Sequence, residues 1–168
     1  MYPIVNIDRM HGTDNHADLR SVKFGSFSGN VFTGAAINNG CVVVLSGAID
    51  FENYYAVAPT STNKFQELWL IASPEYLPNP LEQSLDCFRN ESGALSRAYS
   101  LRDGGCFSIT EDGVDGGSSA SVGAVIYAQN GDVKLKAGSG AIQVGTVSRK
   151  ETRGGKNWLV IDVLEALS

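Results

Sequence analysis

Short apolar runs, separated by Gly, Asn, Asp and Ser, recur from about residue 21 to the end of the chain. Residues 41–45 (Cys-Val-Val-Val-Leu) and 68–71 (Leu-Trp-Leu-Ile) are continuous, which predicts strands that are buried on both faces. Residues 106–110 (Cys-Phe-Ser-Ile-Thr) alternate, which predicts a strand with its Phe and Ile inward and its Ser and Thr outward.

The clearest local pattern predicts a hairpin. Residues 125–128 and 133–137 flank Asn130-Gly131, a dipeptide that favours the two positive φ angles of a type I′ turn. In the second run Val, Leu and Ala share one face and two Lys share the other. This pattern is typical of a half-buried antiparallel strand.

The end of the chain predicts one more strand. Residues 149–157 form a basic segment that contains glycine, which we interpret as a loop, and residues 158–164 follow as an apolar run. Trp158 and Val160 lie on the face opposite Leu, Ile and Val of the same run. A strand that is apolar on both faces is central in a sheet or covered by another subunit, so Trp158 and Val160 are candidate subunit contacts.

Residues 1–20 differ from the remainder because they are polar and aperiodic around a few apolar positions. We interpret them as an extended N-terminal arm that precedes a single β domain at 21–168. The apolar residues of the arm need a surface on which to dock, either on their own domain or on a partner. The candidate docking residues are Tyr2, Ile4, Val5, Ile7 and Met10.

Two further segments complete the predicted fold. Residues 113–121 are polar and glycine-rich, which predicts an exposed loop. Residues 79–88 begin with Asn-Pro and space Leu, Leu and Phe at helical intervals, which predicts one or two helical turns. The expected fold class is therefore all-β: an antiparallel β-barrel or β-sandwich with an extended N-terminal arm and at most one or two short helical turns.

Composition narrows the function classes. The chain has 168 residues, a net charge of −5 and 19 glycines, and an acidic chain of this kind disfavours general nucleic-acid binding. No apolar run approaches the length of a membrane span, and the N-terminus has no signal-peptide pattern. Its three cysteines show no CxxC spacing and are interpreted as small apolar residues.

Candidate chemistry is sparse. His11, Asp14, His16 and Asp18 form the densest polar cluster, but the H-x₄-H spacing suits no helix face, because two histidines at i and i+5 diverge. Both histidines lie in this arm, which disfavours a catalytic site that needs an ordered base. Asp112 and nearby carboxylates lack the ligand spacing of an EF-hand loop. We therefore expect no enzyme activity, no cofactor and no metal.

Basic residues cluster in the second half, where six of 13 lie between positions 134 and 156. One interpretation is a solvated strand face and loop. The alternative is a basic edge that meets an acidic protein surface, where it would contribute to association rate and register.

The order of motifs along residues 20–168 resembles the head-decoration (cement) proteins of tailed bacteriophages. The resemblance rests on five motifs read in sequence. They are Asn39-Gly40-Cys41-Val42-Val43-Val44-Leu45, Glu52-Asn53-Tyr54-Tyr55-Ala56-Val57-Ala58-Pro59, Leu68-Trp69-Leu70-Ile71-Ala72-Ser73-Pro74-Glu75, Asn90-Glu91-Ser92-Gly93-Ala94-Leu95-Ser96-Arg97-Ala98-Tyr99 and Gly105-Cys106-Phe107-Ser108-Ile109-Thr110, followed by a closing Val144-Gly145-Thr146-Val147 with 158–164.

The resemblance implies a β body bound to the outside of an icosahedral shell, with an N-terminal arm that adds capsid contacts and with no catalytic residues. It implies the major capsid protein as the partner, a homotrimer as the assembly, and the outer capsid surface of the virion as the location after synthesis in the host cytoplasm. Membrane and nucleic acid are not expected partners.

Two other classes remain open at this stage. One is a tail or fibre adaptor or a carbohydrate-binding β module of a virion, in which Tyr54, Tyr55, Trp69, Tyr76 and Tyr99 would stack on sugars. The other is a small β-fold hydrolase, which the motifs favour least.

Overall fold

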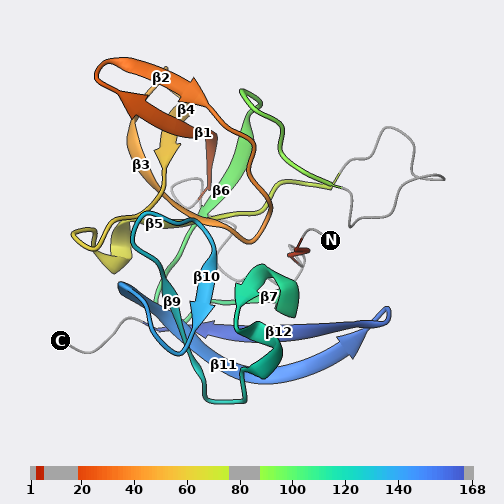
Figure 1. Ribbon diagram of the computed structural model, residues 1–168. Helices are drawn as coiled ribbons and strands as arrows, with labels where there is room; N and C mark the ends of the chain where they lie inside the picture. Colours follow the sequence, from red (N-terminus) through yellow and green to blue (C-terminus); the bar gives the residue numbers. More distant parts are fainter. Residues whose placement is uncertain (1–2, 6–18, 76–87, 165–168) are drawn as a thin grey trace.

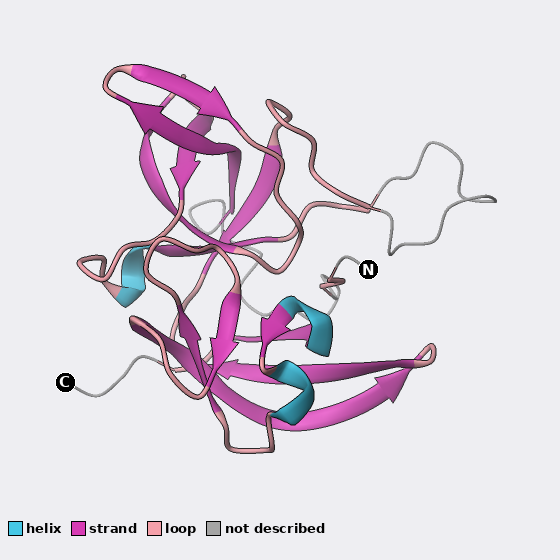
Figure 2. Ribbon diagram, in the orientation of Figure 1, coloured by secondary structure: helices cyan, strands magenta, loops and turns pink. Residues whose placement is uncertain are grey.

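Two six-stranded sheets, one from each half of the chain, make up the fold (Figure 1). The computed structural model describes residues 3–5, 19–75 and 88–164. In these residues the regular structure is strand, apart from three 3₁₀ turns of three residues each (Figure 2). The all-β prediction is therefore confirmed, while the helical turn predicted at 79–88 lies almost wholly outside the described residues.

The first sheet closes on itself. Its strands follow the order β2-β1-β4-β3-β5-β6, and β6 pairs again with β1. The pairing of β1 with β4 is parallel and the others are antiparallel, so the barrel is mixed. Its elements are β1 (Leu19–Ser28), β2 (Val31–Gly34), β3 (Val42–Ala48), β4 (Asn53–Val57), η3 (Phe65–Glu67), β5 (Leu68–Ile71) and β6 (Ser96–Ser100).

The second sheet is open and has the order β7-β12-β11-β9-β10-β8. Strand β12 lies between β7 and β11, which confirms the central position predicted from its two apolar faces. Its elements are β7 (Cys106–Thr110), η5 (Glu111–Gly113), β8 (Val114–Asp115), η6 (Gly117–Ser119), β9 (Val125–Ala128), β10 (Leu135–Ala137), β11 (Ile142–Arg153) and β12 (Lys156–Val163).

Strand β3 explains how the two sheets share a core. Val43 points into the barrel, whereas Val42 and Val44 point to the second sheet, because successive side chains alternate across a strand. Its three valines are all buried, as the continuous apolar run predicts. The barrel interior holds Val22, Ile37, Cys41, Val43, Ala56, Ile71 and Ala98. The cluster between the sheets includes Val5, Val42, Val44, Leu68, Leu70, Phe107, Ile109, Ile126, Leu135, Leu159 and Ile161.

Ile4 and Val5, which belong to the predicted arm, dock on their own domain. Val5 forms a β-bridge with Ile109, and the Thr110 N–H donates to the Ile4 carbonyl at 3.2 Å. Ile4 and Val5 are consequently buried, and the prediction that they contact a capsid is corrected. Ser108 and Thr110 are both 2% exposed, so the outward positions predicted for these two residues do not face solvent.

The predicted hairpin forms, but with a longer connection. Strands β9 and β10 pair antiparallel as predicted, and Gly131 has a φ of 75°. No described residue other than glycine has positive φ, so Asn130 does not complete a type I′ turn. The loop reaches the barrel instead, where the Val42 N–H donates to the Val133 carbonyl at 2.7 Å and the Gly131 N–H donates to the Pro59 carbonyl at 2.8 Å.

Two segments expected to be loops are ordered by pairing. Residues 149–153 continue β11 and pair with β12, so a long hairpin replaces the predicted basic loop (Figure 1). Within 113–121, Val114 belongs to β8 and is 3% exposed, and Gly117 is buried in η6. A side chain at Gly117 would collide with the Glu111 carbonyl, which explains why this stretch is rich in glycine and still packs.

Candidate interaction surface

A two-stranded ribbon extends β1 beyond the barrel and exposes apolar side chains. Among the described strands β2 pairs only with β1, in the register Gly25↔Gly34 to Ser28↔Val31. Gly29 has a φ of 59° and Asn30 does not have a positive φ, which is the pattern of a type II′ turn. We call residues 25–34 the neutral ribbon.

An aromatic cluster holds the neutral ribbon against the barrel. The Phe32 ring lies 4.4 Å from the Tyr55 ring, and the Phe27 ring lies 5.1 Å from Phe32 and 5.2 Å from Tyr55, measured between centroids. Tilted and edge-on contacts of this kind contribute about 0.5–1.5 kcal/mol per pair beyond the buried area. Because an isolated two-stranded hairpin is at best marginally stable, this cluster fixes the ribbon in place.

Gly25 makes the close packing of the ribbon possible. A Cβ atom at this position would stand 2.6 Å from Phe32 Cζ and would also collide with the Thr33 carbonyl. Glycine therefore lets the Phe32 ring cross β1 toward Tyr55. The tight approach requires the absence of a side chain rather than an unusual backbone angle.

Both faces of the neutral ribbon leave apolar side chains in water. Phe27 is 41% exposed on the face of the aromatic cluster, and Val31 is 67% exposed on the opposite face, because the pairs Phe27↔Phe32 and Ser28↔Val31 alternate. The chain carries no charged residue from Phe24 to Ile49. An interface core is typically depleted of charge and enriched in aromatic residues, and the neutral ribbon has both properties.

Sequence reasoning missed this ribbon, although a signal for it exists. Gly29-Asn30 stands between Phe27 and Val31, and Gly-Asn between two apolar runs indicates a two-residue hairpin loop. The absence of charge from Phe24 to Ile49 is a second signal.

The predicted subunit contacts lie inside the molecule. Trp158 is 8% exposed and its Nε1 donates to the Arg153 carbonyl at 3.3 Å, while the Arg153 guanidinium lies 4.8 Å from the centroid of its ring. Val160 is 6% exposed. Their own chain covers both side chains, so the prediction of a subunit contact is corrected. Three of the predicted capsid contacts, Tyr2, Ile7 and Met10, lie outside the described residues.

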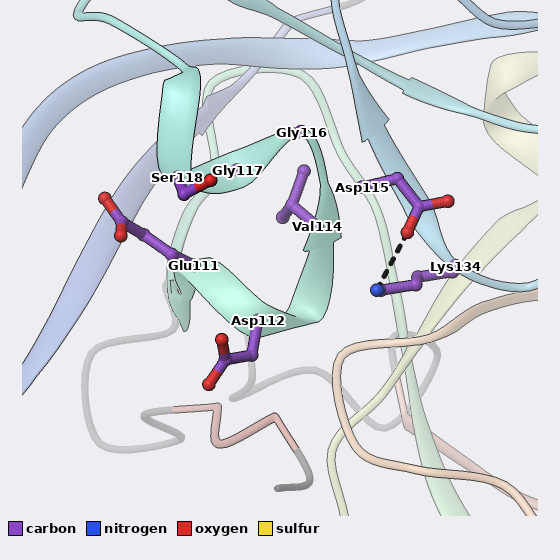
Figure 3. A pocket seen from close by; sticks show the side chains of 8 residues that line it. All are labelled: Glu111, Asp112, Val114, Asp115, Gly116, Gly117, Ser118 and Lys134. Atoms are coloured by element: carbon purple, nitrogen blue, oxygen red, sulfur yellow. Dashed lines mark ion pairs between the residues drawn. The ribbon is translucent and has the colours of Figure 1, made fainter.

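A shallow pocket of about 330 Å³ lies beside the 3₁₀ turns η5 and η6, and Figure 3 shows the side chains that line it. Lys134 Nζ and Asp115 Oδ1 are 2.8 Å apart, and this contact lowers the pKa of the Asp115 carboxyl from its ordinary value of 3.8. Glu111 binds Lys150 at 2.6 Å on the neighbouring hairpin. Of the three carboxylates that line this pocket, those of Glu111 and Asp115 are therefore engaged in intrachain ion pairs.

No group of three or more His, Cys, Asp or Glu within the described ranges is arranged to hold a metal ion. The cluster of His11, Asp14, His16 and Asp18 lies outside those ranges. Cys41 is buried in the barrel, where burial raises the pKa of its thiol to about 11, as expected for a cysteine that acts as a small apolar residue.

The basic run of residues 134–156 is largely neutralised within the chain. Besides Lys134 and Lys150, Arg149 Nε and Arg153 Nε contact the two oxygens of Glu151 at 2.7 and 2.9 Å. Four of the six basic residues thus pair with carboxylates of the same chain. Of these pairs, that of Lys150 with Glu111 links the β11–β12 hairpin to η5. All four leave less positive charge for an acidic partner.

The aromatic residues considered for sugar binding do not form a platform. Tyr99 is 6% exposed in the core between the sheets, and Tyr54 and Trp69 pack on the barrel interior. Tyr55 packs against the neutral ribbon. Tyr76 lies outside the described residues.

These features describe an all-β protein that exposes a neutral ribbon with an aromatic cluster. In the described part of the chain, no helix has the length and apolar character needed to cross a membrane. Searches of family models, curated proteins and solved structures find no match to this chain.

Proposed function

We propose that this protein is a non-catalytic structural protein that decorates and stabilises the outer surface of an icosahedral phage capsid. The resemblance of residues 20–168 to cement proteins supplies the class of partner, the major capsid protein. The observation that carries the proposal is the neutral ribbon, where Phe27 and Val31 lie exposed on a segment without charge. Exposed apolar patches of this kind mark protein-interaction sites.

The chemistry of the ribbon favours a protein partner that is itself uncharged at the contact. Burying Val31 or Phe27 removes apolar surface from water at about 25 cal/mol per Å², and the gain does not depend on counterions. Binding through this surface should therefore respond weakly to salt. Attraction between charged surfaces would instead weaken as salt screens it.

Decoration stabilises a shell by mass action. A ligand that binds only the expanded shell stabilises that state by RT ln(1 + [L]/Kd), and each additional copy contributes the same free energy. If several subunits of one oligomer bind the same capsid lattice, avidity increases this stabilisation. The homotrimer and the outer capsid location remain part of the proposal on these grounds.

Co-sedimentation with undecorated, expanded shells of a tailed phage tests the proposal. The intact chain should sediment with the shells and raise their resistance to heat at both low and high salt. Val31→Ser should weaken this binding about tenfold, because a buried valine contributes about 1.5 kcal/mol. Val122→Ser is the matched control, since Val122 is similarly exposed, at 61%, in the loop before β9.

Failure of the intact chain to sediment with expanded shells at any salt concentration would contradict the proposal. Equal losses in Val31→Ser and Val122→Ser would retain shell binding but remove the neutral ribbon from it. Val31 lies on the face of the ribbon opposite the three aromatic rings, so its substitution should leave the aromatic cluster intact.

A further inference from the structure

We propose that two copies of this chain pair through the free edge of β2, antiparallel and about a two-fold axis at Phe32. The inference deepens the proposed function, because it names a second copy as a partner of the neutral ribbon. It is tested in solution without any shell, so its outcome is independent of capsid binding.

The edge of β2 has backbone groups available for pairing. The Ala35 N–H donates to the Phe24 carbonyl at 2.9 Å, so the hydrogen-bonded pairs with β1 are 24–35, 26–33 and 28–31. The N–H and C=O groups of Phe32 therefore point away from β1. Among the described residues, Ser92 contacts this edge only at its far end, where its Oγ donates to the Gly34 carbonyl at 2.9 Å.

This edge lacks the protection that edge strands usually carry. Natural sheets block free edges with lysine, proline, bulges or inward charges. Strand β2 reads Val-Phe-Thr-Gly, and its pairing with β1 shows no register shift. The strand is protected by its shortness and, at Gly34, by the contact with Ser92. Both limit the contact to a few hydrogen bonds and predict a weak dimer.

Charge favours a second copy as the occupant. The whole chain carries a net charge of −5, so two copies repel each other over most of their surfaces. The segment from Phe24 to Ile49 carries none of that charge. Two neutral ribbons can therefore meet without opposing like charges, whereas a strongly charged strand would find no complementary charge there.

The two-fold geometry also explains the exposed aromatic cluster. With Phe32 on the axis, each Phe32 would exchange both backbone hydrogen bonds with its counterpart, and Val31 would lie opposite Thr33 of the partner. The two Phe32 rings would then stand side by side, joining both aromatic clusters into one. This contact is isologous, unlike the head-to-tail interface that a homotrimer requires.

Sedimentation equilibrium of the full chain tests the pairing. Since the contact is smaller than a standard interface, we expect a monomer–dimer equilibrium with a Kd of about 10–100 μM. Added salt should not weaken the dimer and should tighten it modestly, because it screens the repulsion between two chains of net charge −5. The double variant Val31→Lys with Thr33→Lys places like charges opposite each other at both ends of the contact. It should weaken the dimer at least about tenfold.

A charge-swapped variant makes the register falsifiable. Val31→Lys with Thr33→Glu places Lys opposite Glu in both symmetric positions, so it should recover dimerisation to within about threefold of the unmodified chain at low salt. Val122→Lys is the control for an added surface charge and should leave the Kd unchanged. Circular dichroism of each variant checks that the fold is retained.

A chain that stays monomeric up to about 0.5 mM would overturn the proposal, because edge pairing weaker than this has no significance for assembly. A dimer that both double variants weaken equally would also overturn it, since the two-fold register at Phe32 requires the Lys–Glu variant to recover. Neither result bears on whether the protein sediments with shells.

Discussion

Asn39 shows how a single buried polar side chain organises distant segments. It is 1% exposed, and its Nδ2 donates to the Ser73 carbonyl at 2.9 Å. Its Oδ1 accepts from the Ser73 N–H at 2.9 Å and from Asn90 Nδ2 at 3.1 Å. The residue therefore joins the end of β5 to the chain that leads into β6, and it satisfies three groups that have no access to water.

Replacing Asn39 with alanine should destabilise the fold by about 3 kcal/mol, because buried donors and acceptors of Ser73 and Asn90 lose their partner. Urea denaturation of both proteins measures this loss. Asn130→Ala is the matched control: Asn130 is exposed and its Oδ1 accepts only the Ser61 N–H, at 3.0 Å, so the loss should stay below about 1 kcal/mol. Equal losses would show that burial of the network is not the cause.

At the residue scale, the sequence predicts which apolar side chains are buried, but it does not predict which part of the molecule buries them. Val42 to Val44 are buried as predicted because a continuous apolar run allows few alternatives. The side chains of Trp158 and Val160 are also apolar, and a sequence cannot tell burial by one's own chain from burial by a partner. Arg153, which covers the Trp158 ring, comes from the hairpin strand opposite.

At the scale of elements, pattern predicts strands better than it predicts connections. The strands at 68–71 and 106–110 appear with the predicted bounds. The turn at Asn130-Gly131 differs because Val133 bonds to Val42 of the barrel, a contact that local sequence does not encode. Likewise, residues 149–153 form a strand because they pair with β12, a pairing that their basic, glycine-containing surroundings in the sequence do not indicate.

The short pairing of β8 with β10 should depend on pH through Asp115. Its contact with Lys134 lowers the pKa of the carboxyl below 3.8, so the contribution to stability is present above that value and is lost as pH falls through the lower, folded pKa. Asp115→Asn should therefore cost less than about 1 kcal/mol near neutral pH, since the pair is 40–43% exposed, and the cost should shrink at about pH 2, where more of the carboxyl is protonated.

Urea unfolding at the two pH values measures the effect, with Asp112→Asn on the preceding turn as the control for charge removal alone. A difference between Asp115→Asn and the unmodified chain that is undiminished at about pH 2 would contradict the ion-pair explanation.

At the scale of the whole molecule, the question is whether the two sheets unfold together. The prediction of one β domain at 21–168 assumes a single core, whereas the chain folds as a closed barrel followed by an open sheet (Figure 1). The cluster between them draws Val42 and Leu68 from the barrel and Phe107 and Leu159 from the second sheet. Val5 also enters it, and its β-bridge with Ile109 places this residue at the junction of the two sheets.

The chain provides one tryptophan in each sheet, which allows the cooperativity to be measured. Trp69 lies in β5 and Trp158 in β12, and the protein has no other tryptophan. In Trp69→Phe and Trp158→Phe variants, fluorescence should report the same urea midpoint, once each is corrected for its own change in stability by circular dichroism. Unfolding either sheet alone would expose the shared cluster to water, and this cost couples the two transitions. Two separated midpoints would instead show that the barrel and the open sheet are independent units. In that case Val5→Ala, which leaves a cavity beside Ile109 of the second sheet, should lower only the urea midpoint of the second sheet.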